Sequence, residues 1–290
     1  MSITGTGTQA DPFVVTTYAE LISKASQGSA SEMVYVKLGN DINVLDEYPN
    51  GNVPSVALAA YVDGDGKTIK NLYSQTVSDS NGIFTLSSGS FVNVKFRNIF
   101  TYQPVFSSSS AITSARRAVF QDCEFTGVCN TVFYKANGSC ASFVRCSFNL
   151  KGSSAIIAST YTPLMTNCFI RFSSPATKIF QFTSTASTQK KMLDATYIEA
   201  DMPALKAITM NDGDTTTKDS AVYIDNSVLD IKTEGEFTVG CSDGVREVSI
   251  IRASHAPDVT GTDNIVAVDE THWLDAAYLD SIGFDMEVGT

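Results

Sequence analysis

The sequence contains little of what metal- and cofactor-dependent enzymes use. Its 290 residues include only two histidines, His255 and His272, and none of the six cysteines belongs to a Cys-x-x-Cys pair. Gly-x-Ser-x-Gly, His-Glu-x-x-His and phosphate-binding glycine loops are all missing. We therefore expect no cofactor. The absence of a recognisable acid–base set favours a structural or binding role over catalysis, although carboxylates alone can support catalysis.

Basic residues are also few. The chain has 20 Lys and Arg against 31 Asp and Glu, which gives a formal net charge of −11 with no basic block. Such a chain is a poor binder of nucleic acid or anionic lipid. No apolar run is long enough to span a bilayer, and the N-terminus has no basic region followed by an apolar stretch. We expect no membrane insertion, and synthesis in the cytosol without a signal peptide.

What the sequence does contain is a short pattern that returns along most of its length. The pattern reads apolar, any residue, Asn or Asp, then Cys or a small or apolar residue, any residue, apolar. Matched positions recur every 22 to 30 residues. The segments that carry the pattern are 68–73, 95–100, 119–125, 142–148, 164–170, 192–198, 222–228 and 247–251.

A period of this length indicates stacked structural units that cannot bury a core singly. Each unit is expected to be a strand, because apolar and polar residues alternate over five to seven positions. Leucine-rich repeats share the period but need regular leucines and a helix in every unit, and this chain has neither. The sequence therefore predicts an all-β parallel solenoid of about eight coils, stacked about 4.8 Å apart.

Three cysteines occupy the same position of consecutive repeats, namely Cys123, Cys146 and Cys168. We predict that they form one inward-facing core ladder of free thiols, which behave as small hydrophobic side chains. Cys129 and Cys140 flank a turn-like Asn-Gly and could pair under oxidising conditions. The spacing gives almost no support for zinc.

The two ends differ from the repeats. Residues 1–33 are predicted to form an extended lead and a capping helix, which begins at the capping box Thr17-Tyr-Ala-Glu20 and stops before Gly28. The β-helix is assigned to residues 34–254. Residues 255–290 are predicted to form a C-terminal cap or docking segment. Trp273 and Tyr278 lie on one face of a helix there, and we expect them at an interface.

The first 75 residues resemble a known family. Asp11-Pro12, the capping-box helix, the stretch Tyr35-Val-Lys-Leu-Gly-Asn-Asp-Ile42 and the stretch Val62-Asp-Gly-Asp-Gly-Lys-Thr-Ile-Lys-Asn-Leu72 are similar to the opening of right-handed β-helix proteins of bacterial surfaces and phage particles. The resemblance implies a right-handed parallel β-helix. It says little about chemistry, because this opening serves adhesins, virion fibres and carbohydrate-active enzymes alike.

Three residues are weak candidates for catalysis. Asp122 and Glu124 are two apart in one predicted strand, so their side chains would lie about 7 Å apart, as in an inverting glycosidase. A solvated strand face explains them more simply. By resemblance, polysaccharide lyases of this fold place acidic calcium ligands beside Arg or Lys, and Arg145 aligns with Asp122 and Asn167. We interpret Asp122, Arg145 and Asn167 as a surface polar ladder whose members pair across coils.

Two acidic turns are weak candidates for a metal. Asp63-Gly-Asp-Gly66 resembles a fragment of a calcium loop, but the further oxygen ligands of an EF-hand are absent, so we predict a tight turn. Asn211-Asp-Gly-Asp214 has the same form in a longer loop. Asp212 and Asp214 are therefore the better candidates for loose calcium binding.

These observations favour a virion structural protein. We predict a head or tail fibre or decoration protein of a tailed phage that attaches to the host surface, binds a host glycan through protruding aromatic side chains, contacts other virion proteins and trimerises. The alternative is a carbohydrate-active depolymerase, a lyase or hydrolase, in the same setting. A bacterial surface adhesin is a third possibility, which the missing export signal and cell-wall anchor disfavour.

Overall fold

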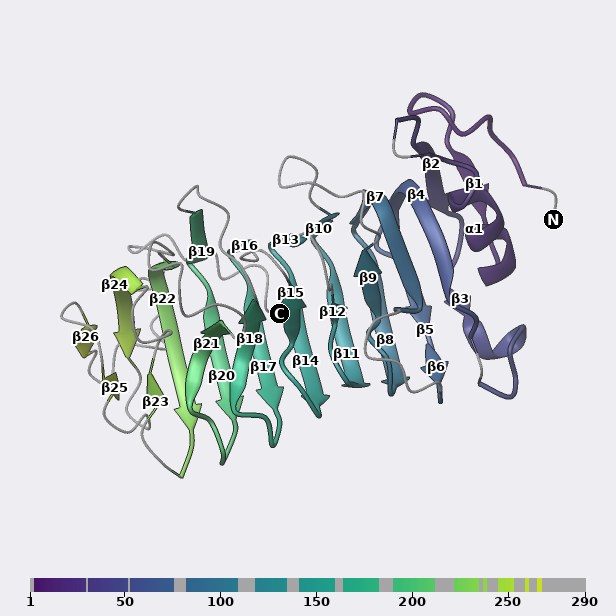
Figure 1. Cartoon of the computed structure of the whole chain (residues 1–290). Helices are drawn as coiled ribbons and strands as arrows, with labels where there is room; N and C mark the ends of the chain where they lie inside the picture. The colour runs from purple at the N-terminus through teal and green to yellow at the C-terminus, as the bar shows by residue number, and fades with distance from the viewer. Residues whose placement is uncertain are drawn as a thin grey trace. The chain divides into compact units, whose positions relative to one another are not determined.

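The computed structural model describes residues 3–29, 31–51, 53–75, 82–108, 118–134, 141–159, 164–182, 190–211, 222–234, 237–238, 245–252, 259–260 and 265–267. Over these residues the chain is nearly all β, and its strands pair in parallel as a β-solenoid (Figure 1). The described residues make about six turns rather than the eight predicted. None of the described helices is long and apolar enough to cross a bilayer.

The chain divides into two compact units, residues 1–142 and 143–290, which we call unit 1 and unit 2. The sequence predicted one β-helix over 34–254 with separate ends. Parallel pairing extends beyond those limits on both sides, because Phe13–Val15 pairs with Val34–Leu38 and Ile265–Ala267 pairs with Val245–Arg252.

Unit 1 contains one α-helix, one 3-10 helix and twelve strands in its described part. The helices are α1 (Tyr18–Ala25) and η1 (Val44–Asp46). The strands are β1 (Phe13–Val15), β2 (Val34–Leu38), β3 (Ile42–Asn43), β4 (Val56–Asp63), β5 (Thr68–Lys70), β6 (Tyr73–Ser74), β7 (Phe84–Val92), β8 (Lys95–Thr101), β9 (Phe106–Ser108), β10 (Ala118–Gln121), β11 (Glu124–Cys129) and β12 (Phe133–Tyr134).

These strands form three parallel rows, as a solenoid with three-sided coils requires. One row is β1–β2–β4–β7–β10, a second is β3–β5–β8–β11, and a third joins the start of β7 to β9 and β12. Like residues of successive coils therefore stack in the interior. Phe91 lies on Phe120 and Phe96 lies on Phe125, with ring centroids 5.8 and 5.2 Å apart and ring planes within 5° of parallel.

The helix α1 begins at the predicted capping box. The Thr17 hydroxyl accepts a hydrogen bond from the Glu20 amide, and the Glu20 carboxylate accepts one from the Thr16 amide. Glu47 also accepts hydrogen bonds from the first two helical amides, which stabilises the positive end of the helix. The apolar face of α1 packs against β2 and β4 (Figure 1).

Unit 2 repeats the three-row arrangement in its described residues. The boundary between the units falls within β13 (Ala141–Val144). The other strands are β14 (Ser147–Gly152), β15 (Ile157–Ser159), β16 (Leu164–Thr166), β17 (Phe169–Ser173), β18 (Lys178–Phe182), β19 (Lys190–Asp194), β20 (Tyr197–Asp201), β21 (Ala207–Asn211), β22 (Val222–Lys232), β23 (Phe237–Thr238), β24 (Val245–Arg252), β25 (Val259–Thr260) and β26 (Ile265–Ala267).

The bends between strands use left-handed backbone, which L-residues other than Asn and Asp adopt at a cost. In unit 1 the residues with positive φ include Asn93 and Asp122, at φ 54° and 53°. In the described part of unit 2 they are Arg145, Asn167 and Ala195, at 49°, 51° and 47°. The Asn or Asp of the repeated pattern is thus a bend residue.

A second bend in unit 1 carries a ladder of asparagine amides. Asn98 donates to the side-chain oxygen of Asn71 at 3.1 Å, and Asn71 donates to that of Asn43 at 2.7 Å. Asn43 in turn donates to Asp46 Oδ1 at 2.6 Å. We call these four residues the amide ladder; it ties three coils together on their outer side.

Candidate functional site

The predicted pair Asp122 and Glu124 does not lie on one strand, so the prediction of that geometry was wrong. β10 ends at Gln121, β11 begins at Glu124, and Asp122 turns the chain between them with φ 53°. Glu124 is ion-paired with Arg97 on the neighbouring strand β8, with two N–O distances of 2.9 Å. These carboxylates therefore serve a bend and a cross-coil ion pair.

Arg145 and Asn167 also lie at bends. The Arg145 amide donates to the Thr166 carbonyl at 2.9 Å, and the Asn167 amide donates to the Asp194 carbonyl at 3.0 Å. Both residues thus continue the parallel backbone pairing of unit 2 through its turns. Asp122 belongs to unit 1, so the proposed ladder through all three residues stays a prediction.

The structure buries Cys123, Cys146 and Cys168 as free thiols. Within unit 2, Cys146 and Cys168 occupy equivalent positions of adjacent coils, since the Phe169 amide donates to the Cys146 carbonyl at 3.0 Å. The next coil places the buried Thr196 in that position. In unit 1, the repeat alignment predicted that Cys123 lies beside Ile99. The strand register places it beside Val94 instead.

Several predicted sites lie outside the described residues. They are the metal candidates Asp212 and Asp214, the interface candidates Trp273 and Tyr278, both histidines, and Cys140. Among the residues that are described, no group of three or more His, Cys, Asp or Glu side chains could hold a metal ion.

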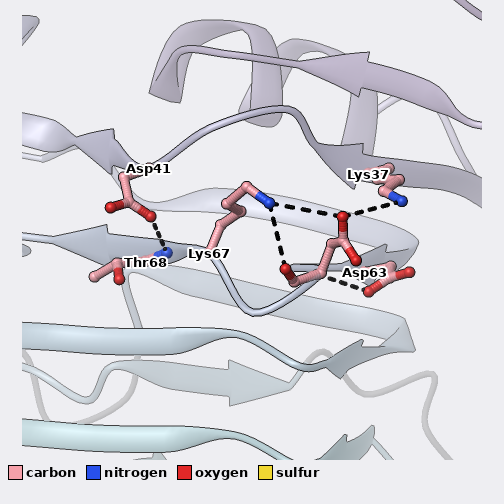
Figure 2. A network of polar contacts seen from close by, with 6 residues as sticks. Lys37, Asp41, Asp63, Lys67 and Thr68 are labelled. Atoms are coloured by element: carbon pink, nitrogen blue, oxygen red, sulfur yellow. Dashed lines mark hydrogen bonds and ion pairs between the residues drawn. The ribbon is translucent and has the colours of Figure 1, made fainter.

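The acidic turn at residues 63–66 is a tight turn stabilised by lysines (Figure 2). The Asp65 carboxylate lies 3.2 Å from Lys37 Nζ and 3.6 Å from Lys67 Nζ. Its own amide donates to Asp63 Oδ1 at 2.8 Å. The hydrogen bond and charge of Lys37 hold the pKa of Asp65 below its usual value. These contacts give both carboxylates a structural role.

Asp41, in the stretch 35–42 that also carries the resemblance, has a similar structural role. Asp41 Oδ1 accepts a hydrogen bond of 2.8 Å from the Thr68 amide at the start of β5 (Figure 2). The residues that carry the family resemblance therefore hold the first coils of unit 1 together, and none of these contacts indicates a ligand.

An apolar strip is exposed on the outside of unit 1. Phe100 on β8 lies in register with Tyr73 on β6 and with Val128 on β11. The Tyr73 and Phe100 rings stack 5.2 Å apart, and Tyr102 packs edge-on against Phe100. The exposed fractions of Phe100, Val128 and Tyr102 are 38%, 42% and 52%. These three account for all but one of the exposed large hydrophobic side chains in the described residues. We call Tyr73, Phe100, Tyr102 and Val128 together the exposed row.

Strands β14, β17, β20 and β22 lie side by side in unit 2 (Figure 1). A charged groove lies on the outside of these four strands. Strand register places its polar side chains in two parallel lines, each with one residue from every strand. The groove encloses about 220 Å³. The first line is Asn149, Arg171, Glu199 and Asp230, and the second is Lys151, Ser173, Asp201 and Lys232.

The first line has one ion pair and one deeply placed acid. Arg171 Nε and Nη2 each lie 2.8 Å from Glu199 Oε2. The Asp230 side chain is in the least accessible part of the line, since the residue is only 9% exposed. Burial raises the pKa of the neighbouring Tyr197, and the carboxylates of Asp230 and Glu199 raise it further.

The groove continues beyond these lines. A second cavity of about 410 Å³ shares Lys151, Ser173 and Asp201 with the first and extends to the end of β14 and to the turns after β17 and β20. Sequence reasoning missed the groove because each repeat was taken to end at its last apolar residue. Continuing the alternation by one residue would have brought Asn149, Arg171 and Glu199 into one column.

Comparisons with known proteins give one structural likeness. No family model matches the chain, and no curated protein sequence matches it. A crystal structure of a "putative immunoglobulin A1 protease" from Bacteroides ovatus is similar over 91% of this chain and 83% of that chain, with 16% sequence identity and a TM-score of 0.49. A likeness at this level carries no argument about function.

Proposed function

We propose that this chain is an attachment protein of a tailed-phage particle, and that the exposed row of unit 1 contacts a glycan of the host surface. The exposed row is the observation that carries the proposal. Apolar side chains that gather on a surface in this way usually mark a site of interaction. Here Tyr73, Phe100 and Val128 lie in register on adjacent coils, and Tyr102 packs beside Phe100. Together they form a continuous apolar strip on unit 1.

The chemistry of the row suits a sugar. Tyr73, Phe100 and Tyr102 present apolar ring surface, and sugar rings have faces of C–H groups that pack on such surface. A net charge of −11 weakens attraction to anionic polymers, so packing contributes more to binding than long-range charge. The proposal includes a trimer, in which further virion proteins contact the assembly.

Truncation of the row tests glycan contact. Phe100→Ala and Tyr102→Ala should each weaken co-sedimentation with intact host cells by about tenfold, the effect of about 1.4 kcal/mol. Leu45→Ala is the matched control, because Leu45 is 37% exposed and lies in η1 outside the row. Unchanged binding of both row variants, or an equal loss for the control, would contradict the proposed contact.

Particle composition tests the virion assignment separately. Gradient-purified phage particles should contain the chain, detected by peptide mass spectrometry, in fixed ratio to the major capsid protein. Its absence from particles, together with its presence on the surface of uninfected bacteria, would favour the adhesin instead.

The charged groove of unit 2 favours one second candidate, a glycoside hydrolase. Glu199 and Asp230 are directly opposite each other on paired strands, so their backbones are about 4.8 Å apart. Carboxyl groups that start from this backbone spacing can approach the separation of about 5–5.5 Å found in retaining glycosidases. Release of reducing ends from host polysaccharide, abolished by Glu199→Gln, would support this candidate over a binding protein.

A further inference from the structure

The charged groove carries equal numbers of cations and anions. Its three cationic residues are Lys151, Arg171 and Lys232, and its three anionic residues are Glu199, Asp201 and Asp230. A chain with a net charge of −11 thus presents a surface without net charge at this place. An ionic ligand of either sign meets as many repulsive as attractive groups here, whereas a neutral ligand rich in hydroxyls finds both donors and acceptors.

The ion pair within the groove leaves polar atoms for such a ligand. Both contacts from Arg171 go to Oε2 of Glu199, so this pair does not engage Oε1 of Glu199 or Nη1 of Arg171. The corresponding pair in unit 1 differs, because Arg97 engages both oxygens of Glu124 in a fork. The two pairs have the same chemistry and similar exposure, and the Arg171–Glu199 pair lines the charged groove.

The charged groove is least accessible at Asp230. Asp230 is 9% exposed, and a hydrogen bond to a carboxylate in such a site is stronger than one in water. The adjoining cavity beside Lys151 and Asp201 lengthens the site along the strands. Both carboxylates and cationic groups line the combined site.

We propose that the charged groove binds a neutral oligosaccharide, whose adjacent hydroxyl groups donate to Glu199 and Asp201 and accept from Arg171 and Lys232. A planar guanidinium ion-paired with a carboxylate offers donors and acceptors side by side, which suits neighbouring hydroxyls of a sugar ring. The groove lies in unit 2, so this site is independent of the exposed row and of incorporation into a particle.

Defined hexasaccharides test the proposal on the intact chain. The neutral probes are the hexamers of α- and β-linked glucose, mannose and N-acetylglucosamine, and the charged probes are hexagalacturonate and the chitosan hexamer. Isothermal titration should detect a neutral hexamer at about 1 mM or below, an affinity of about −4 kcal/mol. This affinity should change little with salt, because no net charge is neutralised.

The two arginine pairs supply the matched variants. Arg171→Gln and Asp201→Asn should each weaken binding of the neutral hexamer by about tenfold. Arg97→Gln, which breaks the corresponding pair in unit 1, should leave it unchanged. Circular dichroism of all three variants should match that of the unmodified chain, since both pairs are largely exposed.

Three results would overturn the proposal. They are no binding of any neutral hexamer, an equal loss with Arg97→Gln, or tighter and steeply salt-dependent binding of a charged probe. Failure of the exposed-row proposal is distinguishable, because Tyr102→Ala would then leave cell binding intact whatever the groove binds.

Discussion

Arg97 and Glu124 form a fork on the outside of unit 1, with Nε to Oε1 and Nη2 to Oε2 both at 2.9 Å. The two residues are 27 positions apart in sequence and lie on adjacent coils. The Arg97 side chain is 49% exposed and that of Glu124 is 27% exposed. Solvent therefore screens the pair strongly, and its contribution to stability is modest.

A double-mutant cycle should measure that contribution. We expect Arg97→Gln, Glu124→Gln and the double variant to give a coupling free energy of about 0.5 kcal/mol by urea unfolding. The coupling should fall in about 1 M NaCl, where the screening length is short. A coupling that is large and insensitive to salt would show that the pair is more buried than its exposure indicates.

Left-handed backbone at Ala195 provides a test of the bends. Ala195 and Ala200 are both buried alanines of unit 2, but Ala195 has φ 47° and Ala200 lies in the extended strand β20. Replacement by Gly removes one buried methyl and adds chain entropy at both sites. It relieves backbone strain only at Ala195. Ala195→Gly should thus be more stable than Ala200→Gly by about 1–2 kcal/mol. Equal stabilities in urea would contradict the assigned bend.

Two phenylalanines of β8 separate core packing from surface packing. Phe96 is fully buried and stacks on Phe125, whereas Phe100 is 38% exposed. Phe96→Ala should lower the free energy of unfolding by about 3–5 kcal/mol. Phe100→Ala should cost about 1 kcal/mol, mainly from the lost ring stacking. Thermal unfolding followed by circular dichroism checks both values, and similar losses would contradict the assigned strand faces.

The Asp65 turn predicts a dependence of stability on pH. The folded pKa of Asp65 lies below its unfolded value because of Lys37, so its contribution is present above the unfolded pKa of about 3.9. That contribution is lost as the pH falls through the folded pKa. Asp65→Asn should therefore be less stable than the unmodified chain at neutral pH and equally stable in strong acid. Urea unfolding across this range checks the sign, and a difference that persists in acid would contradict it.

Thiol reactivity should report burial in unit 1. Burial raises the pKa of Cys129 to about 12, so almost no thiolate forms at pH 8. Iodoacetamide should leave Cys129 unmodified in the folded chain and should modify it rapidly in concentrated urea, as shown by peptide mass spectrometry. Glutathione in the same tube is the control for reagent activity. Modification of Cys129 at the rate of glutathione would contradict its placement.

The sequence predicted the fold because a solenoid is a local rule repeated many times. A period of two to three dozen residues, strand alternation and the Thr17 capping box all depend on residues near one another in the chain. The alignment of Leu72 with Ile99 agrees with the register, but that of Ile99 with Cys123 was wrong, because β8 contains an additional bend at Asn98 that makes Ile99 look like the residue after a corner. Val94 has that position, and its neighbour Asn93 makes the bend.

The groove was harder to predict, because it depends on which residues meet across coils. Arg171 and Glu199 are 28 positions apart, and the predicted repeats ended one residue before each of them. Asp122 and Glu124, by contrast, are close in sequence but are separated by a bend. Proximity along the chain was therefore a poor guide to the site, whereas register between strands identifies it.

The amide ladder has a direction, because Asn98 and Asn71 each donate a side-chain hydrogen bond to the asparagine of the preceding coil. A side-chain amide is both a donor and an acceptor, so a series of amides can continue from coil to coil. The Asp46 carboxylate ends the series, because it accepts a hydrogen bond from Asn43 and has no N–H or O–H to donate. The series is thereby terminated chemically at its N-terminal end, and a further coil inserted before Asn43 would have to bring its own acceptor.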